Sequence, residues 1–258
     1  MPDPTIRTEI NPSGLATVTL NRPEVHNAFN DTLINELASA LKELAADASL
    51  RAIVLAGEGT SFCAGADLEW MRRTAGYSPE QNYEDALALA ELLRLLDTLP
   101  KPTIAAVQGA AYGGGAGLVA CCDIAIASER ATFAFPEVRL GLIPAIISPY
   151  VIAAVGARQA RRYFLSGERF GASEAHRIGL VHQVNPEESL QSAVEAAGAG
   201  IGKGGPAAVR AAKELIRAIS SHADEKTLPE ETARSISAMR ASEEASRRIQ
   251  AFLEKRKP

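Results

Sequence analysis

Hydrophobic positions along the first two-thirds of the chain follow two different periods. Residues 15–20 alternate with a period of two, whereas residues 30–44 carry leucines three or four positions apart, as on one face of a helix. Strands are expected at residues 15–20, 51–56, 103–107, 123–127 and 132–135, and helices at 30–44, 83–96 and 116–122. Because nearly continuous apolar strands are typical of a sheet buried on both faces, the pattern predicts an α/β domain.

The pattern changes after about residue 145, where strand signals fade. Helices are expected at residues 158–164, 172–178, 190–197, 206–219 and 242–256. We therefore interpret residues 1–195 as the core and residues 196–258 as a helical region. Such a region either packs on the core or supplies a surface for oligomerisation.

Composition narrows the class of protein. The 258 residues are 47% hydrophobic and 22% charged with a net charge of −4, which is typical of a globular protein and lacks the basic stripe of a nucleic-acid binder. The three cysteines, Cys63, Cys121 and Cys122, favour a reducing compartment over a disulfide framework. Without metal-ligand spacing, an apolar span or a leader pattern, we expect a cytoplasmic protein with no metal, membrane or nucleic-acid partner.

Three segments carry candidate chemistry. Residues 61–68 (SFCAGADL) allow a ligand close to the backbone, and a helix starting after Asp67 would turn N–H groups outward. Residues 109–117 hold three consecutive glycines, without the lysine of a P-loop or the spacing of a dinucleotide fingerprint. Glu137 lies among apolar residues, where burial would suit it to acid–base catalysis. Taken singly, the segments also fit a tight loop, a packed strand–helix joint and an ion pair between Glu137 and Arg139.

Taken in order, these segments resemble the crotonase superfamily of enoyl-CoA hydratases and isomerases over essentially the whole chain. The resemblance rests on LNRPE at 20–24 with Asn27 and Ala28, AGAD at 64–67, the glycine run, Pro136 with Glu137, and the final AFLEKRKP. It implies that the core over residues 1–195 is a superhelix of ββα units. It also implies that the helices of residues 196–258 build a homotrimer, often paired into a hexamer.

The resemblance further implies a substrate and site residues. The substrate is an acyl-CoA thioester, so that coenzyme A is part of the substrate and no separate cofactor is expected. The N–H groups of Ala66 and Gly114 hold the thioester oxygen, and Glu137 moves the proton. The positions that match CoA contacts are Val25, His26, Ala64, Asp67 and Leu68, together with Phe252 and Lys255, which often reach the CoA of a neighbouring subunit.

One departure from the family pattern bears on the reaction. Hydratases of this family usually carry a second glutamate after the glycine run, and Gly117 stands at that position here. A Δ3,Δ2-enoyl-CoA isomerase needs only one base, and Glu137 alone would serve it. However, residues 62–71, 113–123 and 138–150 resemble bacterial methylglutaconyl-CoA hydratases of leucine breakdown, which share the missing glutamate.

The leading hypothesis is therefore hydration of a short branched enoyl-CoA, 3-methylglutaconyl-CoA above all. The alternatives are an isomerase, a broad-range enoyl-CoA hydratase, and a non-catalytic member that binds CoA or RNA. The carboxylate of such a substrate would call for a cation, and the candidates are Arg72, Arg73 and Arg139. Candidates for the acyl pocket are Trp70 and Met71, and candidates for a hydrogen-bond donor are Tyr112 and Tyr150.

Overall fold

A computed structural model describes residues 4–220 and 226–254 of the chain. Its centre is a six-stranded sheet in the order β1-β2-β3-β4-β6-β9. The strands are β1 (Ile6–Ile10), β2 (Leu15–Leu20), β3 (Ala52–Gly57), β4 (Thr103–Val107), β6 (Ile124–Ser128) and β9 (Gln183–Asn185). β1 and β2 form an antiparallel hairpin, and every other neighbouring pair is parallel.

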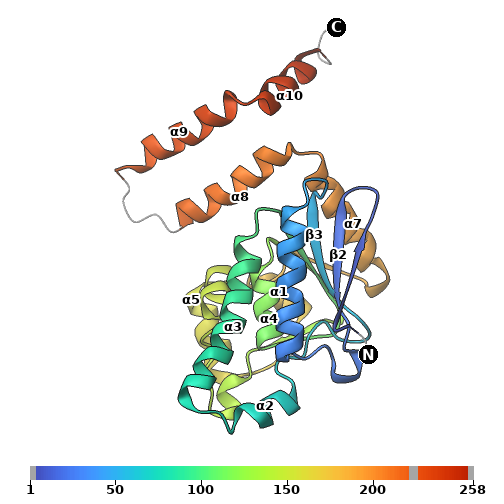
Figure 1. The fold of residues 1–258 in the computed structure, drawn as a ribbon, viewed down its shortest axis with the longest axis vertical. Helices are drawn as coiled ribbons and strands as arrows, with labels where there is room; N and C mark the ends of the chain where they lie inside the picture. Colours follow the sequence, from blue (N-terminus) through green and yellow to red (C-terminus); the bar gives the residue numbers. More distant parts are fainter. Residues whose placement is uncertain (1–3, 221–225, 255–258) are drawn as a thin grey trace.

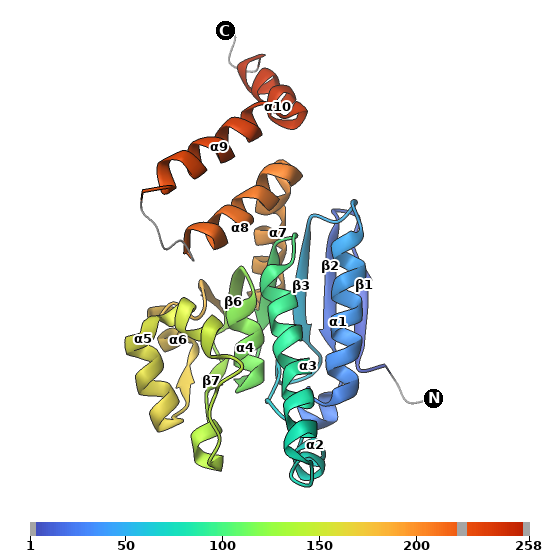
Figure 2. The same ribbon diagram turned by 60° about the vertical axis from the view of Figure 1, so that its left-hand side comes forward.

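Helices cover both faces of this sheet, as Figures 1 and 2 show. α1 (Asp31–Ala46), α3 (Pro79–Thr98) and α4 (Gly114–Cys121) pack on one face, and α7 (Leu190–Gly202) packs on the other. The strands divide their side chains accordingly: in β3, Ile53 and Leu55 belong to the first core, whereas Val54 faces α7. The expectation of an α/β domain with both faces covered is confirmed.

A smaller sheet lies beyond the carboxyl ends of the central strands. It consists of β5 (Ala110–Tyr112), β7 (Thr132–Ala134) and β8 (Phe170–Gly171). β4 continues almost directly into β5, and β6 into β7, so that the chain steps twice from the large sheet to the small one. In the first unit, α4 follows at once and returns the chain to the face of the large sheet, as expected of a ββα unit.

The remaining elements frame the body and extend from it. They are α2 (Leu68–Thr74), α5 (Ser148–Ser166), α6 (Ala172–Arg177), α8 (Pro206–Ser220), α9 (Leu228–Arg240), α10 (Glu243–Glu254) and the 3-10 turns η1 (Pro23–Val25), η2 (Glu137–Leu140) and η3 (Glu187–Ser189). In both views α8, α9 and α10 rise from the end of the molecule opposite α2 (Figures 1 and 2). None of the helices in the described ranges has the length and apolar character needed to span a membrane.

The structure confirms the five expected strands to within a residue at each end and corrects the sequence analysis elsewhere. The expected absence of strands after residue 145 is wrong, because β8 and β9 lie there. Both are too short to show a period, and β9 begins and ends with polar residues at a sheet edge. The helix expected at 83–96 begins at Pro79, where Ser78 and Gln81 form a capping box. The proposed boundary after residue 195 falls inside α7.

Candidate active site

Two segments that the sequence analysis singled out lie side by side. The loop after β3 runs along β5: Cys63 and Ala111 form a parallel bridge, and the Tyr112 N–H donates to Cys63 O at 3.0 Å. Ala66 and Gly114 each lie three residues beyond this bridge along parallel chains. The pairing therefore brings Ala66 and Gly114 to the same level, just before α2 and at the start of α4.

Ala66 and Gly114 offer two backbone donors to one cavity. Gly114 is the first residue of α4, and the opening N–H groups of a helix have no partner inside it. Among the described residues, neither the Ala66 N–H nor the Gly114 N–H donates to a protein acceptor. Two unpaired N–H groups beside a helix N-terminus form a site in which negative charge on an oxygen is stabilised.

Glycine is required where these segments approach each other. Gly113 has a φ of 51°, and a Cβ there would lie 3.1 Å from Oε1 of Glu137. At Gly115 a Cβ would lie only 2.2 Å from Cys63 O. The glycine run therefore allows both the close packing of the two segments and the approach of the Glu137 carboxylate.

Glu137 opens the 3-10 turn η2 and lines the same cavity. Its Oε2 is buried and has no hydrogen-bond partner within the described part of the chain. Burial raises the pKa of this carboxyl above its ordinary value. The alternative of an ion pair with Arg139 is wrong: the Arg139 side chain packs against Gly167, and Glu137 is left with an unsatisfied oxygen.

The cavity has a volume of about 340 Å³ and walls that are almost entirely apolar. The residues predicted from the sequence that line it are Ala64, Ala66, Leu68, Trp70, Met71, Gly114 and Glu137. Trp70 is held in place by a hydrogen bond of 3.0 Å from Nε1 to Asp85. Glu137 is the one charged residue among those that line the cavity in the described structure. The arrangement joins one carboxylate, two backbone donors and a hydrophobic chamber.

Asp67 does not line the cavity, unlike Ala64, Ala66 and Leu68 in the same segment. Its carboxylate is buried, receives Arg22 Nη2 at 2.7 Å and accepts from the N–H groups of Glu69 and Trp70 as the cap of α2. Burial opposes ionisation, but these donors outweigh it and hold the pKa of Asp67 below its ordinary value. The side chain therefore fixes the loop, and CoA contact at Asp67 stays a prediction.

The sequence analysis missed the role of Arg22, the ion-pair partner of Asp67. Arg22 Nη1 also donates to Ala28 O at 2.6 Å, and the backbone N–H of Arg22 donates to Asn27 Oδ1 at 2.8 Å. Nearby, the Phe29 N–H donates to Gly65 O at 2.7 Å. Residues 22–29 thus support the loop that carries Ala66. Arg22 stood inside the LNRPE motif, which was the only signal for it.

Val25 and His26 lie outside the cavity, at the end of η1: Val25 is its last residue and His26 its C-cap. His26 has a φ of 53°, its Nδ1 lies 3.1 Å from Ser61 Oγ, and its carbonyl accepts from the Ala64 N–H. The turn is thus attached to the loop that carries Ala66. A CoA contact at these two residues remains a prediction.

The tyrosine and arginine candidates do not line the cavity. The hydroxyl of Tyr112 lies 3.0 Å from Thr132 Oγ1, which corrects its proposed role as a donor to the substrate. Burial raises the pKa of Tyr150 to about 12, and its side chain packs against the core. On α2, Arg72 pairs with Glu69 and Arg73 pairs with Asp31 at exposed positions.

Of the two C-terminal candidates, the structure describes only Phe252, which lies far from this cavity. Phe252 is 55% exposed on α10, at the opposite end of the molecule from α2 (Figure 1). Lys255 falls outside the described residues. Within one chain Phe252 does not take part in the site, so its predicted contact would have to be made in a neighbouring subunit.

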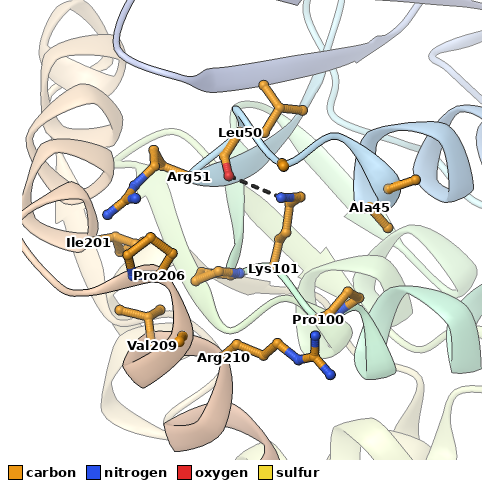
Figure 3. Close-up of a pocket in the computed structure, with 13 residues that line it drawn as sticks. Ala45, Leu50, Arg51, Pro100, Lys101, Ile201, Pro206, Val209 and Arg210 are labelled. Atoms are coloured by element: carbon orange, nitrogen blue, oxygen red, sulfur yellow. Dashed lines mark hydrogen bonds between the residues drawn. The ribbon is translucent and has the colours of Figure 1, made fainter. Parts of the chain in front are cut away.

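A second cavity, of about 320 Å³, lies at the amino ends of β3 and β4, the opposite edge of the sheet (Figure 3). The basic side chains that line this cavity do not point together into its open space. Lys101 donates to Leu50 O at 3.0 Å, Arg51 donates to Gly204 O at 2.7 Å, and Arg210 pairs with Glu214. Each cation is thus engaged by a protein acceptor, and of these contacts only the bond from Arg51 ties the segment between α7 and α8 to the sheet. The apolar cavity is therefore the candidate active site.

Thiol and metal chemistry find no support at the site. Burial raises the pKa values of Cys63 and Cys122 to about 12, and that of Cys121 still further. All three cysteines are buried, as expected of small core residues. In the ranges that the structure describes, no three His, Cys, Asp or Glu side chains come together as ligands for a metal ion.

Comparison with known proteins agrees with this geometry. The family model described as enoyl-CoA hydratase/isomerase matches residues 10–258. The 2,3-dehydroadipyl-CoA hydratase of Escherichia coli is 35% identical over 245 residues, which cover 93% of this chain and 92% of that protein.

Solved structures agree as well. A crystal structure of an enoyl-CoA hydratase from Shewanella pealeana has a TM-score of 0.93 and 42% identity, covering 98% of this chain and 95% of that one. AtuE of Pseudomonas aeruginosa has a TM-score of 0.93 and 35% identity, with 98% of each chain covered. The chain therefore belongs to the enoyl-CoA hydratase/isomerase family and has the crotonase fold that its sequence resembles.

Proposed function

We propose that the protein is an enoyl-CoA hydratase in which Glu137 carries both proton transfers. The observation that supports this most is the pairing of an unsatisfied, buried carboxylate oxygen with two unpaired backbone N–H groups in one apolar cavity. The N–H groups of Ala66 and Gly114 would accept the negative charge that develops on the thioester oxygen. Glu137 would act as base and then as acid.

The proposed reaction balances with one carboxylate. Glu137 removes a proton from water as the water oxygen bonds to C3 of the enoyl chain. The electron pair of the double bond moves to the thioester oxygen, which Ala66 and Gly114 stabilise as an enolate. Glu137 then returns the proton to C2. The raised pKa of Glu137 suits both steps, since it makes the carboxylate a stronger base and lets the acid form persist to higher pH than in an ordinary glutamate.

Glu137→Gln tests this assignment. We expect kcat for crotonyl-CoA hydration to fall by about 10²- to 10⁴-fold, which is the usual contribution of general acid–base catalysis. Binding of coenzyme A, measured by calorimetry, should change little because Glu137 acts on the acyl group, which coenzyme A itself lacks. Activity of the variant near the wild-type level would refute the role of Glu137. Migration of the double bond of a 3-enoyl-CoA without hydration would replace the hydratase with the isomerase.

For the acyl group we propose 3-methylglutaconyl-CoA, and hence a place in leucine breakdown, on the strength of the resemblance at residues 62–71, 113–123 and 138–150. The relative named 2,3-dehydroadipyl-CoA hydratase also carries a dicarboxylic acyl name. The remote carboxylate of 3-methylglutaconyl-CoA would need a cation from outside the cavity wall. Arg72 and Arg73 are the candidates, because α2 also supplies Leu68, Trp70 and Met71 to the cavity.

The apolar lining favours a second candidate, a hydratase of uncharged short-chain enoyl-CoA thioesters. Assays of Arg72→Ala and Arg73→Ala with 3-methylglutaconyl-CoA and with crotonyl-CoA distinguish the two candidate functions. If either arginine meets the carboxylate, KM for the first substrate should rise about tenfold while KM for the second stays constant. Wild-type preference for crotonyl-CoA would remove 3-methylglutaconyl-CoA as the substrate.

A further inference from the structure

The wall of the active-site cavity beside Gly114 is built by an unusually close contact. Gly117 lies three residues after Gly114 in α4, and its N–H donates to Gly113 O at 3.0 Å. Ile147, the N-cap residue directly before α5, approaches Gly117 from the other side. A Cβ at residue 117 would lie 2.4 Å from Cγ2 of Ile147 and 3.1 Å from its Cβ. The isoleucine branch therefore occupies the space into which any side chain at residue 117 would project.

Ile147 also faces the substrate space. It is 3% exposed, belongs to the main core, and lines the cavity together with Gly114 and Glu137. Its backbone carbonyl accepts the Val151 N–H at 3.0 Å, which fixes its position at the start of α5. The rigid β-branched side chain of Ile147 narrows the cavity beside α4 and presents apolar atoms to it.

We infer that Ile147 is a specificity-determining residue, which forms a steric pair with Gly117 and limits the width of the acyl site. The pair leaves no room for a second carboxylate on the α4 wall, so that proton transfer falls to Glu137 alone. The part of this inference that concerns acyl selectivity rests on the proposed hydratase function. The steric pair itself rests on the distances between residue 117 of α4 and Ile147.

The steric pair is tested by stability. Gly→Ala inside a helix ordinarily stabilises it, but we expect Gly117→Ala to lower Tm by about 5 °C because the new methyl group overlaps Ile147. In the Ile147→Ala background, which is itself less stable, the same Gly117→Ala change should cost little further stability, since the Cγ2 atom is gone. A Gly117→Ala protein as stable as wild type, or a Gly117→Ala loss that is equally large in the Ile147→Ala background, would overturn the pair. This measurement needs no enzymatic activity, so it stays informative if the hydratase proposal fails.

Selectivity is tested with Ile147→Ala alone. We expect the ratio of kcat/KM for a branched six-carbon enoyl-CoA to that for crotonyl-CoA to change about tenfold toward the larger substrate, as is usual when methylene groups leave a pocket wall. Val151→Ala is the matched control, because Val151 is fully buried one turn later in α5 and does not line the cavity. Both variants should lose stability, and only Ile147→Ala should move the ratio. An equal shift in the two variants would show that Ile147 has a structural role alone.

Discussion

At the scale of single residues, the burial of Glu137 links catalysis to stability. The raised pKa means that folding at neutral pH forces the carboxylate into a poorly solvated place, whereas the unfolded chain ionises freely. The folded state therefore holds its proton to higher pH than the unfolded state. This group favours folding below its ordinary pKa, and the benefit is lost as pH rises through the raised value.

Glu137→Gln should accordingly be more stable than wild type at neutral pH, because the amide carries no charge to bury. The difference should shrink as the pH falls toward 4.5, the ordinary value, where both side chains become neutral. Urea unfolding at a series of pH values measures it. Glu129→Gln, at an exposed position, is the control for the loss of a charge. A variant less stable than wild type at neutral pH would contradict the assigned burial.

Asp67 shows the opposite electrostatics at a neighbouring position. Its side chain is 7% exposed and that of Arg22 is 15% exposed, so Asp67→Ala leaves a nearly buried cation without its partner and removes the cap of α2. We expect a loss of about 3 kcal/mol in the free energy of unfolding. A fall in kcat should accompany it, since Ala66 is adjacent. Asp47→Ala removes local hydrogen bonds to Ser49 at the surface and should cost much less. Equal losses would mean that the ion pair does not support the loop.

At the scale of elements, the sequence was most informative where the period was long or the strand buried. α1 was predicted because four leucines repeat on one face and Asn30 caps it, with Oδ1 accepting the Leu33 N–H. β9 and α9 escaped because their signals are weak: β9 has three residues, and all of α9 is solvent-accessible. The sequence motifs pointed to Glu137, Ala66 and Gly114. The close approach of Ile147 to Gly117, which leaves no space for a Cβ, joins two segments that no sequence spacing connects.

The attachment of α8 to the sheet is a prediction at this scale. Lys213 Nζ lies 2.7 Å from Asp123 Oδ2, and the same carboxylate oxygen accepts from the Thr103 N–H and hydroxyl at the start of β4. Lys213→Met should lower the free energy of unfolding by about 2 kcal/mol, because a charged hydrogen bond is lost at a side chain only 10% exposed. Thermal melts measure this loss. Arg210→Met breaks an exposed pair on the same helix and should cost much less, because exposed ion pairs contribute little to stability. Equal effects would contradict the attachment.

At the scale of the whole molecule, the C-terminal helices carry apolar side chains that the single chain leaves accessible. These are Leu215, Ile216 and Ile219 on α8, Ile236 on α9, and Ile249, Phe252 and Leu253 on α10. α9 and α10 stand away from the body in both views, with α8 between them and the body (Figures 1 and 2). Apolar surface of this extent marks an interaction site. We propose that it is buried in the homotrimer or hexamer that the resemblance implies.

The test of this assembly uses two isoleucines of equal exposure. Ile249 on α10 is 53% exposed and Ile10 on the edge strand β1 is 54% exposed, so exchanging either for Glu adds the same charge to a surface of the same accessibility. Light scattering of the wild type should give three or six times the chain mass of 27.3 kDa. Ile249→Glu should reduce the measured mass to that of the monomer, since a charge buried at an interface is strongly unfavourable, and Ile10→Glu should leave the mass unchanged.

If CoA reaches Phe252 of a neighbouring subunit, the Ile249→Glu monomer should also bind CoA more weakly, although its cavity is intact. A wild-type monomer, or dissociation by both substitutions alike, would contradict assembly through these helices.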